Sequence, residues 1–135
     1  MKINALSTVE NGVYVANSRI ECAGNGLFAS KYFKRGEYIT LYDGETLTKK
    51  QAWKRPCLTH MAGREGVIVD GLKQPIVGRG GGSFANGSQL YHDSNAKIVA
   101  WLGYLVLRAK TNIEPDNEII VHYGRRGFLL AMGYD

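Results

Sequence analysis

The sequence predicts a mainly β fold made of short strands, in one domain of 135 residues. Runs of β-branched and aromatic residues recur between glycine, asparagine and aspartate, which is typical of strands joined by tight turns. Glycine is frequent, with 17 residues against three prolines, so long helices are disfavoured. No internal repeat is visible, and the one biased segment is the glycine-rich stretch at residues 78–83.

The expected strands follow one another along the whole chain. They are residues 13–16, 19–22, 37–42, 66–69, 75–77, 97–101, 104–109 and 118–123. The spacing of Thr48 and Gln51 is that of a capping box, so a short helix is expected to begin there and to end before Pro56. A second short helix is expected at 125–132, and residues 46–64 are interpreted as an insertion between strands.

Charge and cysteine content narrow the function classes. Seventeen basic and twelve acidic residues give a net charge of +5, which favours acidic partners and permits weak, nonspecific binding to nucleic acid. The basic residues are scattered, so a solvated basic face is favoured over a dedicated nucleic-acid groove. The two cysteines, Cys22 and Cys57, form no C-x-x-C pair, and no metal site is predicted.

We expect an intracellular protein that does not cross a membrane. The longest strongly apolar run is residues 98–107, whereas a membrane-spanning helix needs about 18 or more. The first residues also lack the apolar core and cleavage site of a secretory signal.

Two glycine-containing turns are candidate ligand sites. At Gly24-Asn25-Gly26 the missing Cβ atoms let backbone groups approach a ligand, although an ordinary hairpin turn is an alternative. A dinucleotide fingerprint is excluded there because the chain lacks the alternating strands and long helices that it requires. At Asn86-Gly87 no lysine follows the glycine run as a phosphate loop requires, so the asparagine either binds a polar ligand or pins the local backbone.

The last predicted strand carries a third candidate. Its alternation places Glu118, Ile120 and His122 on one face, so Tyr123 lies with the apolar residues of the other face. A buried tyrosine hydroxyl needs a hydrogen-bond partner, which is either a ligand or a backbone carbonyl.

Taken in order, these stretches resemble the SET-domain protein lysine methyltransferases. The resemblance rests on the segments 24–29 (GNGLFA), 35–39 (RGEYI), 42–45 (YDGE), 84–88 (FANGS), 94–96 (SNA) and 113–124. The sequence departs from the family pattern at Gly87, Ser94 and Asn117, where the family usually has histidine, proline and an acidic residue.

The resemblance implies the SET-domain fold of several small curled sheets, with a C-terminal pseudoknot and one or two short helices. Residues 1–135 would then form a single SET-like catalytic domain without pre-SET or post-SET zinc elements. The implied activity is transfer of methyl groups from S-adenosylmethionine to the side-chain amine of a protein lysine.

The resemblance also implies roles for individual residues. Tyr123 matches the catalytic tyrosine and Tyr42 a second tyrosine of the substrate channel. Ile98 and Val121 stand at the channel positions that limit the number of methyl groups, and because neither carries a hydroxyl, di- or trimethylation is expected. The residues implied in cofactor binding are Gly24, Asn25, Gly26, Asn86, Gly87, Tyr123 and Phe128.

A histone tail is the substrate class that the resemblance favours, which places the protein in the nucleus, or in the host nucleus if it is viral. A homodimer is expected by similarity to the small viral members. Acidic side chains are expected to hold the basic peptide. They are Glu114, Asp116 and Glu118, or Asp43 and Glu45.

Two other functions stay open. One is a SET-like module that binds a peptide or cofactor without turnover, suggested by Gly87 and Asn117. The other is a basic β-barrel that binds nucleic acid, suggested by the net charge and by aromatic residues such as Trp53 and Tyr91.

Overall fold

The computed structural model describes residues 7–8, 12–21, 23–57, 60–88 and 93–122, and these confirm a mainly β fold of small curled sheets. In chain order the elements are β1 (Ser7–Thr8), β2 (Val13–Asn17), β3 (Asn25–Ala29), β4 (Tyr38–Leu41), β5 (Gly44–Leu47), α1 (Lys49–Trp53), β6 (Met61–Arg64), β7 (Val67–Gly71), the 3-10 helix η1 (Gly82–Phe84), β8 (Asn86–Ser88), β9 (Ala96–Trp101), β10 (Tyr104–Ala109) and β11 (Glu118–His122).

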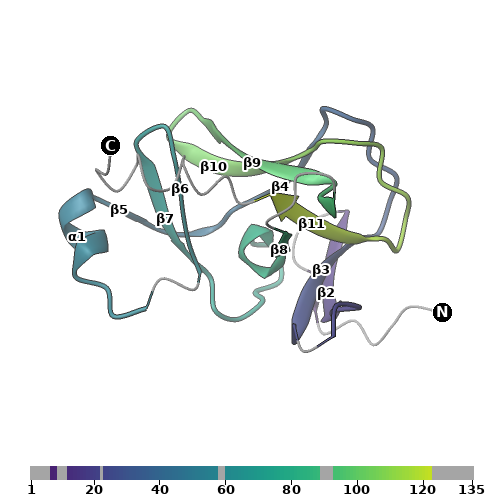
Figure 1. Ribbon diagram of the computed structural model, residues 1–135, viewed down its shortest axis with the longest axis horizontal. Helices are drawn as coiled ribbons and strands as arrows, with labels where there is room; N and C mark the ends of the chain where they lie inside the picture. The colour runs from purple at the N-terminus through teal and green to yellow at the C-terminus, as the bar shows by residue number, and fades with distance from the viewer. Residues whose placement is uncertain (1–6, 9–11, 22, 58–59, 89–92, 123–135) are drawn as a thin grey trace.

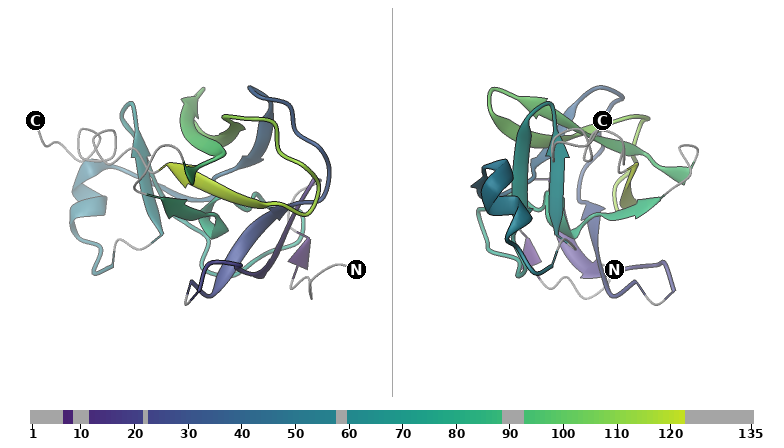
Figure 2. Two further views of the ribbon diagram at one scale, coloured as in Figure 1. Left: turned by 45° about the vertical axis from the view of Figure 1, so that its right-hand side comes forward. Right: turned by 60° about the vertical axis from the view of Figure 1, so that its left-hand side comes forward.

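The strands form two sheets. The larger has the order β1-β2-β3-β11-β9-β10-β4, with β8 paired to β11, and the smaller has the order β5-β7-β6. Figure 1 shows the smaller sheet and α1 at one end of the molecule and the β2–β3 hairpin at the other. Both views of Figure 2 keep α1 beside the smaller sheet, whose strands β6 and β7 contact β9 and β10.

β11 connects the parts of the larger sheet. Its first residues pair with β3 in antiparallel fashion, through Glu118 and Ile119. Its last residues run parallel to two earlier strands, so that Val121 is the register partner of both Gly87 in β8 and Ala96 in β9. The chain therefore inserts this strand between two that precede it. The expected pseudoknot also involves residues beyond 122, which lie outside the described residues.

Side-chain alternation along β11 confirms the predicted faces. Ile119 and Val121 are fully buried, whereas Glu118, Ile120 and His122 are half-buried. Ile119 and Val121 belong to the main core, which gathers apolar side chains from β2, β3, β4, β9, β10 and β11. Complete burial of a side chain of this size contributes about 1.5–3 kcal/mol, so β11 is fixed chiefly by its apolar face.

The predicted capping box is present at the start of α1. The Gln51 backbone N–H donates to Thr48 Oγ1 at 3.1 Å, and the Thr48 backbone N–H donates to Gln51 Oε1 at 2.9 Å. The helix ends at Trp53, before Pro56, as expected. The second expected helix, at residues 125–132, lies outside the described residues. Among the described helices, none is long and apolar enough to span a membrane.

The glycine run at residues 78–82 allows the backbone to approach the end of β4. A Cβ atom at Gly80 would lie 2.3 Å from the carbonyl oxygen of Leu41, and one at Gly82 would lie 2.7 Å from Tyr42 Cα. The Gly81 backbone N–H donates to the buried hydroxyl of Thr40 at 3.0 Å. These glycines therefore allow the loop to pack closely against β4, and the hydrogen bond from Gly81 fixes its backbone there.

Some predicted strands are wrong. Residues 19–21 belong to the turn of the β2–β3 hairpin, in which the Ser18 N–H donates to the Gly24 carbonyl, and residues 75–77 lead into another turn. In contrast, β3 and β8 contain glycine or asparagine and were expected as turns. Pairing with distant strands overrides the local preference of these residues.

Candidate functional site

The two glycine-containing turns, although far apart in sequence, meet in the structure. Asn86 Nδ2 donates to the carbonyl oxygen of Asn25 at 3.0 Å, across a separation of 61 residues. The first turn is open to solvent, because Gly24 and Asn25 are both exposed and nothing lies within 4 Å of where a Gly24 Cβ would be. Gly24 also has φ +72, a left-handed conformation that favours glycine. The structure therefore brings together two turns that the family resemblance assigns to one cofactor.

The Glu118 carboxylate connects the two turns at this contact, which is called the junction below. Its Oε2 accepts hydrogen bonds from Ser18 Oγ at 2.6 Å and from Asn86 Nδ2 at 3.2 Å, and its Oε1 accepts one from the Arg19 backbone N–H at 2.9 Å. A Cβ atom at Gly26 would lie 2.4 Å from Glu118 Oε2, so glycine here leaves room for the carboxylate in its observed position. In the sequence analysis Glu118 was named only as an acidic side chain for a basic peptide, and its positioning role was missed. Its place on the polar face of β11 was the available signal.

Asn95 aligns β11 with the loop that precedes β9. Its Oδ1 accepts from the Ile120 backbone N–H at 2.8 Å, and its Nδ2 donates to the Glu118 carbonyl at 2.9 Å. Its own backbone N–H donates to the Ile120 carbonyl at 2.9 Å. The Asn95 side chain thus makes hydrogen bonds to the β11 backbone of the kind that a neighbouring strand would make. Asn95 lies within the segment 94–96, which is part of the family resemblance.

Tyr42, Ile98 and Val121 lie in one apolar cluster of the core. The Tyr42 side chain is 5% exposed, and its hydroxyl donates to the His60 carbonyl at 2.7 Å. Close packing on this ring depends on a small neighbour, because a Cβ atom at Gly71 would lie 3.0 Å from Tyr42 Cε1. The three residues predicted from different segments to share a channel therefore share one buried environment.

Two predicted site residues, Tyr123 and Phe128, lie outside the described residues. The strand that leads to Tyr123 is described as far as His122, which is the register partner of Ser88 in β8. β8 begins at Asn86, whose side chain contacts the Asn25 turn. The backbone immediately before Tyr123 is therefore aligned with the strand that carries the second turn.

Most of the acidic side chains expected to hold a basic peptide have partners within the protein. Arg79 donates to both Asp43 carboxylate oxygens at 2.7 Å, and this guanidinium lowers the pKa of Asp43 despite partial burial. Glu45 pairs with Arg55 at 2.7 Å, and the Glu118 carboxylate is engaged as described. These groups are bound within the protein because folding brings their partners from other segments.

Asp116 is likewise engaged. It accepts a 2.8 Å hydrogen bond from the hydroxyl of Tyr14, whose ring stacks on Phe28 with 5.5 Å between the ring centroids. The pKa of Tyr14 is raised to about 12, chiefly because the hydroxyl is buried and secondly because it donates a hydrogen bond to Asp116. Tyr14 is therefore a neutral structural donor, and Asp116 is fixed beside the β2–β3 hairpin.

Within the described ranges, no group of three or more histidine, cysteine, aspartate and glutamate residues could hold a metal ion. The arrangement instead offers an exposed turn with accessible backbone groups, a polar junction at Glu118 and Asn86, and an apolar cluster at the inner face of β9 and β11. Such a combination suits a polar ligand on one side and an apolar chain on the other.

A family model described as the SET domain matches residues 24–124 of the chain. A comparison with curated protein sequences gave no match.

Solved structures share the fold at low sequence identity. They include ctPRC2 in an autoinhibited conformation bound to S-adenosylmethionine, with a TM-score of 0.63 and 20% identity over 90% of this chain and 16% of that chain. A humanized mutant of the Chaetomium thermophilum Polycomb Repressive Complex 2, bound to the inhibitor GSK126, gives a TM-score of 0.65 and 23% identity over 90% and 16%. ctPRC2 in complex with H3K27me3 and H3K27M gives a TM-score of 0.63 and 21% sequence identity, over 87% of this chain and 15% of that chain.

Proposed function

Because the chain belongs to the SET-domain family, we propose that it transfers methyl groups from S-adenosylmethionine to the side-chain amine of a lysine in a protein substrate. The observation that carries the proposal is the 3.0 Å hydrogen bond between Asn86 and Asn25. It joins the two predicted cofactor turns beside the strand that leads to Tyr123. We further propose that residues 1–135 act as one catalytic domain.

The residues at the junction fit the cofactor. The open space in front of Gly24 leaves its backbone accessible, and Asn86 and Gly87 are half-buried beside it. We propose that these residues, with Asn25 and Gly26, hold S-adenosylmethionine, and that Phe128 covers its adenine. When bound, the cofactor supplies an electrophilic methyl group on a sulfonium sulfur. Glu118 contributes indirectly, because it fixes Asn86 and the turn at Ser18 in place.

The substrate lysine must react as a neutral amine. A free lysine has a pKa near 10.4, so presenting it uncharged at pH 7 costs about 4.6 kcal/mol. The buried apolar side chains of Ile98 and Val121 favour the neutral form, because removal from water penalises the ammonium ion. The lysine proton leaves to solvent before the channel closes. The neutral amine nitrogen would then be able to accept the methyl group that the bound cofactor would supply, and no general base would be needed.

We assign the two tyrosines to alignment of this attack. The Tyr42 hydroxyl is anchored on the His60 carbonyl, so its ring forms a fixed wall of the apolar cluster. Tyr123 is proposed to place its hydroxyl near the amine and the methyl group, and such alignment is worth several kcal/mol. Since neither Ile98 nor Val121 carries a hydroxyl that would hold a water molecule, di- or trimethylated lysine is the proposed product.

A histone tail is the proposed substrate, supported by family membership and by the similarity to ctPRC2 in complex with H3K27me3 and H3K27M. This substrate would place the protein in the nucleus, or in the host nucleus if it is viral. A homodimer is also proposed, and sedimentation measures it directly.

Calorimetric titration with S-adenosylmethionine, followed by radiolabelled methyl transfer to mixed histones, tests the proposed function. Saturable binding with transfer supports it, and mass spectrometry of the product peptide then counts the methyl groups. Binding without transfer would identify a SET-like module that lacks turnover. DNA binding without cofactor binding would favour a nucleic-acid-binding function over methyl transfer.

The first prediction concerns Tyr123. Tyr123→Phe removes the aligning hydroxyl, so the methylation rate should fall by at least about tenfold while cofactor affinity stays within a few-fold. Single-turnover methyl transfer and calorimetry measure the two effects separately. Tyr32→Phe is the matched control, because Tyr32 is exposed and lies outside the candidate site. Near-normal turnover in Tyr123→Phe would refute the assignment.

A further inference from the structure

The outer face of β4, β10 and β9 carries an ordered array of side chains. Register places Tyr38, Arg108 and Lys97 across the three strands in one row. The next row is Leu41, Val106 and Val99, and the third pairs Tyr104 with Trp101. The alternate residues of β9 and β10, including Ile98, Leu105 and Leu107, point into the core. This face is therefore separate from the apolar cluster of the proposed methyl-transfer site.

Aromatic rings on this face remain exposed to solvent. Tyr38 is 45% exposed, Trp101 54% and Tyr104 58%, although all three are large hydrophobic residues. Between them lies a groove of about 310 Å³, lined by Tyr38, Trp101, Val106 and Arg108. The lining is mostly apolar with one guanidinium at its edge, so the groove suits planar apolar groups that carry negative charge nearby.

Among the residues that the structure describes, the positive charges on this face form no ion pair. The ion pairs among the described residues involve Arg55, Lys73 and Arg79, and none includes Lys97 or Arg108. Lys97 stands directly opposite Arg108, and like charges so placed destabilise a sheet. The nearest carboxylate in sequence to Tyr38, that of Glu37, accepts a hydrogen bond from the Lys34 backbone N–H.

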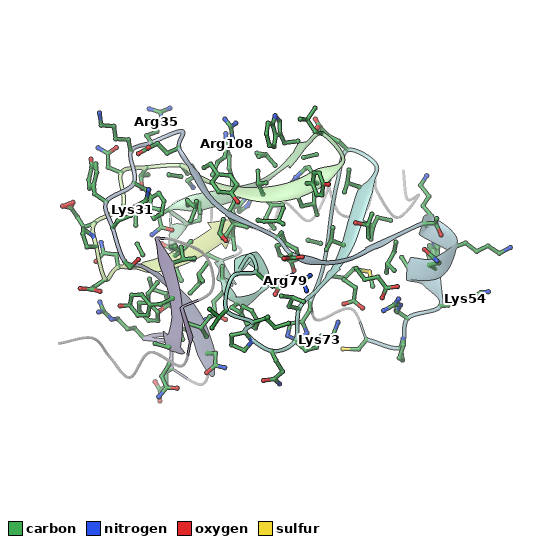
Figure 3. All side chains as sticks on the ribbon, turned by 180° about the vertical axis from the view of Figure 1, so that it is seen from behind. Lys31, Arg35, Lys54, Lys73, Arg79 and Arg108 are labelled. Carbon is green, nitrogen blue, oxygen red and sulfur yellow. The ribbon has the colours of Figure 1, made fainter. Side chains whose placement is uncertain are left out.

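A third cation lies toward the same side of the molecule. Figure 3 shows the side chains of Arg35 and Arg108 extending from the same edge, with Lys54 at the far end. A bound anion would relieve the repulsion between these groups, whereas a second copy of this face would add to it.

We propose that this face binds single-stranded nucleic acid without sequence preference. Bases stack on Tyr38, Trp101 and Tyr104, and phosphates contact Lys97 and Arg108, which is the combination of stacking and charge that such binding uses. Tyr104 and Arg108 are four residues apart on β10, about 13 Å along the strand. The row of Tyr104 and Trp101 and the row of Arg108 and Lys97 are thus far enough apart for a strand of a few nucleotides to cross the face.

The test uses a fluorescein-labelled oligothymidylate of about 20 nucleotides and fluorescence anisotropy. Trp101→Ala should weaken binding by at least about fivefold, since a stacked base loses its platform. The matched control is Trp53→Ala, because Trp53 is exposed to a similar degree, at 55%, but lies on α1. Trp53→Ala should bind within about twofold of the unchanged protein.

Charge is tested on the same probe. The double variant Lys97→Ala/Arg108→Ala should lower the slope of log affinity against log salt by about 1.4, or about 0.7 for each lost contact. The double variant Lys49→Ala/Lys54→Ala, which removes two exposed cations beside the smaller sheet, should leave the slope unchanged. Should Trp101→Ala fold poorly by circular dichroism, Tyr104→Ala replaces it, with Trp101→Phe expected to retain binding.

Three results would overturn the proposal. The first is equal affinity in Trp101→Ala and Trp53→Ala, and the second is equal salt slopes in the two double variants. The third is displacement of the oligonucleotide by poly-glutamate at equal charge concentration, which would identify an acidic peptide as the ligand. Methyl transfer is not measured in any of these experiments, so their failure leaves the proposed function unaffected.

Discussion

Glu118 joins three segments of the chain through one carboxylate. It accepts hydrogen bonds from the turn at Ser18 and Arg19 and from Asn86, and Gly26 leaves room for it. Hydrogen bonds to a charged acceptor are worth about 1.5–3 kcal/mol each, more than those between neutral groups. The arrangement of the cofactor turns therefore depends on this residue although it is not expected to touch the substrate.

Glu118→Gln should lower the free energy of unfolding by about 1–3 kcal/mol, because an amide NH₂ group cannot accept a hydrogen bond from the donors that face it. Affinity for S-adenosylmethionine should fall with it, since Asn86 and the Asn25 turn lose their common support. Urea unfolding and calorimetry measure these effects. Glu114→Gln at an exposed position is the control. Equal urea midpoints for the two variants would contradict the positioning role.

Asp43 makes a pH-dependent contribution to stability. Its pKa is lowered in the folded protein by the Arg79 guanidinium, so the contact stabilises the fold above the unfolded-state pKa near 3.9 and is lost as the pH falls through the folded-state pKa. Because Arg79 is 45% exposed, solvent screening limits the effect.

Asp43→Asn should therefore lower the free energy of unfolding by about 1 kcal/mol at pH 7, and the difference from the unchanged protein should shrink as the pH falls below about 3.9. Urea unfolding at a series of pH values measures this. A difference that stays constant down to acidic pH would show that the charge of Asp43 is not its source.

The β9–β10 hairpin shows how one element can be strained locally and stable overall. Its two turn residues, Leu102 at φ +50 and Gly103 at φ +83, have the positive φ values of a type I′ turn. Asparagine is preferred at the first of these positions, and leucine there costs about 1–2 kcal/mol. The six register pairs between β9 and β10 hold the hairpin in this form.

Leu102→Asn should raise the stability by about 1 kcal/mol, because the Leu102 side chain is 77% exposed and little buried area is lost. Thermal unfolding measures the change. Leu102→Ala is the comparison, since it removes the side chain without the preference for positive φ, and it should not stabilise to the same extent. An unchanged melting temperature in Leu102→Asn would contradict the account of strain.

The same elements show what could be predicted from sequence. β9, β10 and β11 were predicted closely because each is a run of β-branched and aromatic residues, and in β11 buried residues also alternate with half-buried ones. β3 was mistaken for a turn because it contains Gly26. The glycine at this position leaves room for the side chain of Glu118, which lies 92 positions later in the chain. Such a constraint comes from tertiary contact, and local preference does not reveal it.

At the scale of the whole molecule, the family resemblance assigned the Asn25 and Asn86 turns to one cofactor but did not indicate the groups that hold them together. The order of short motifs was sufficient for the first, while Glu118 and Asn95 act through backbone and side-chain contacts that no spacing reveals. The intramolecular partners of the expected acidic peptide-binding residues were not predicted, for a similar reason. Arg79 reaches Asp43 across 36 residues and occupies it.

The placement of β11 between β8 and β9 has a consequence for synthesis of the chain. While the ribosome is still adding residues before 118, both older strands present unpaired edges where β11 will later lie, and such edges attract other chains. Pairing partners separated by this length of chain also form late in folding. A nascent polypeptide released early would therefore have neither turn secured and would be prone to aggregate.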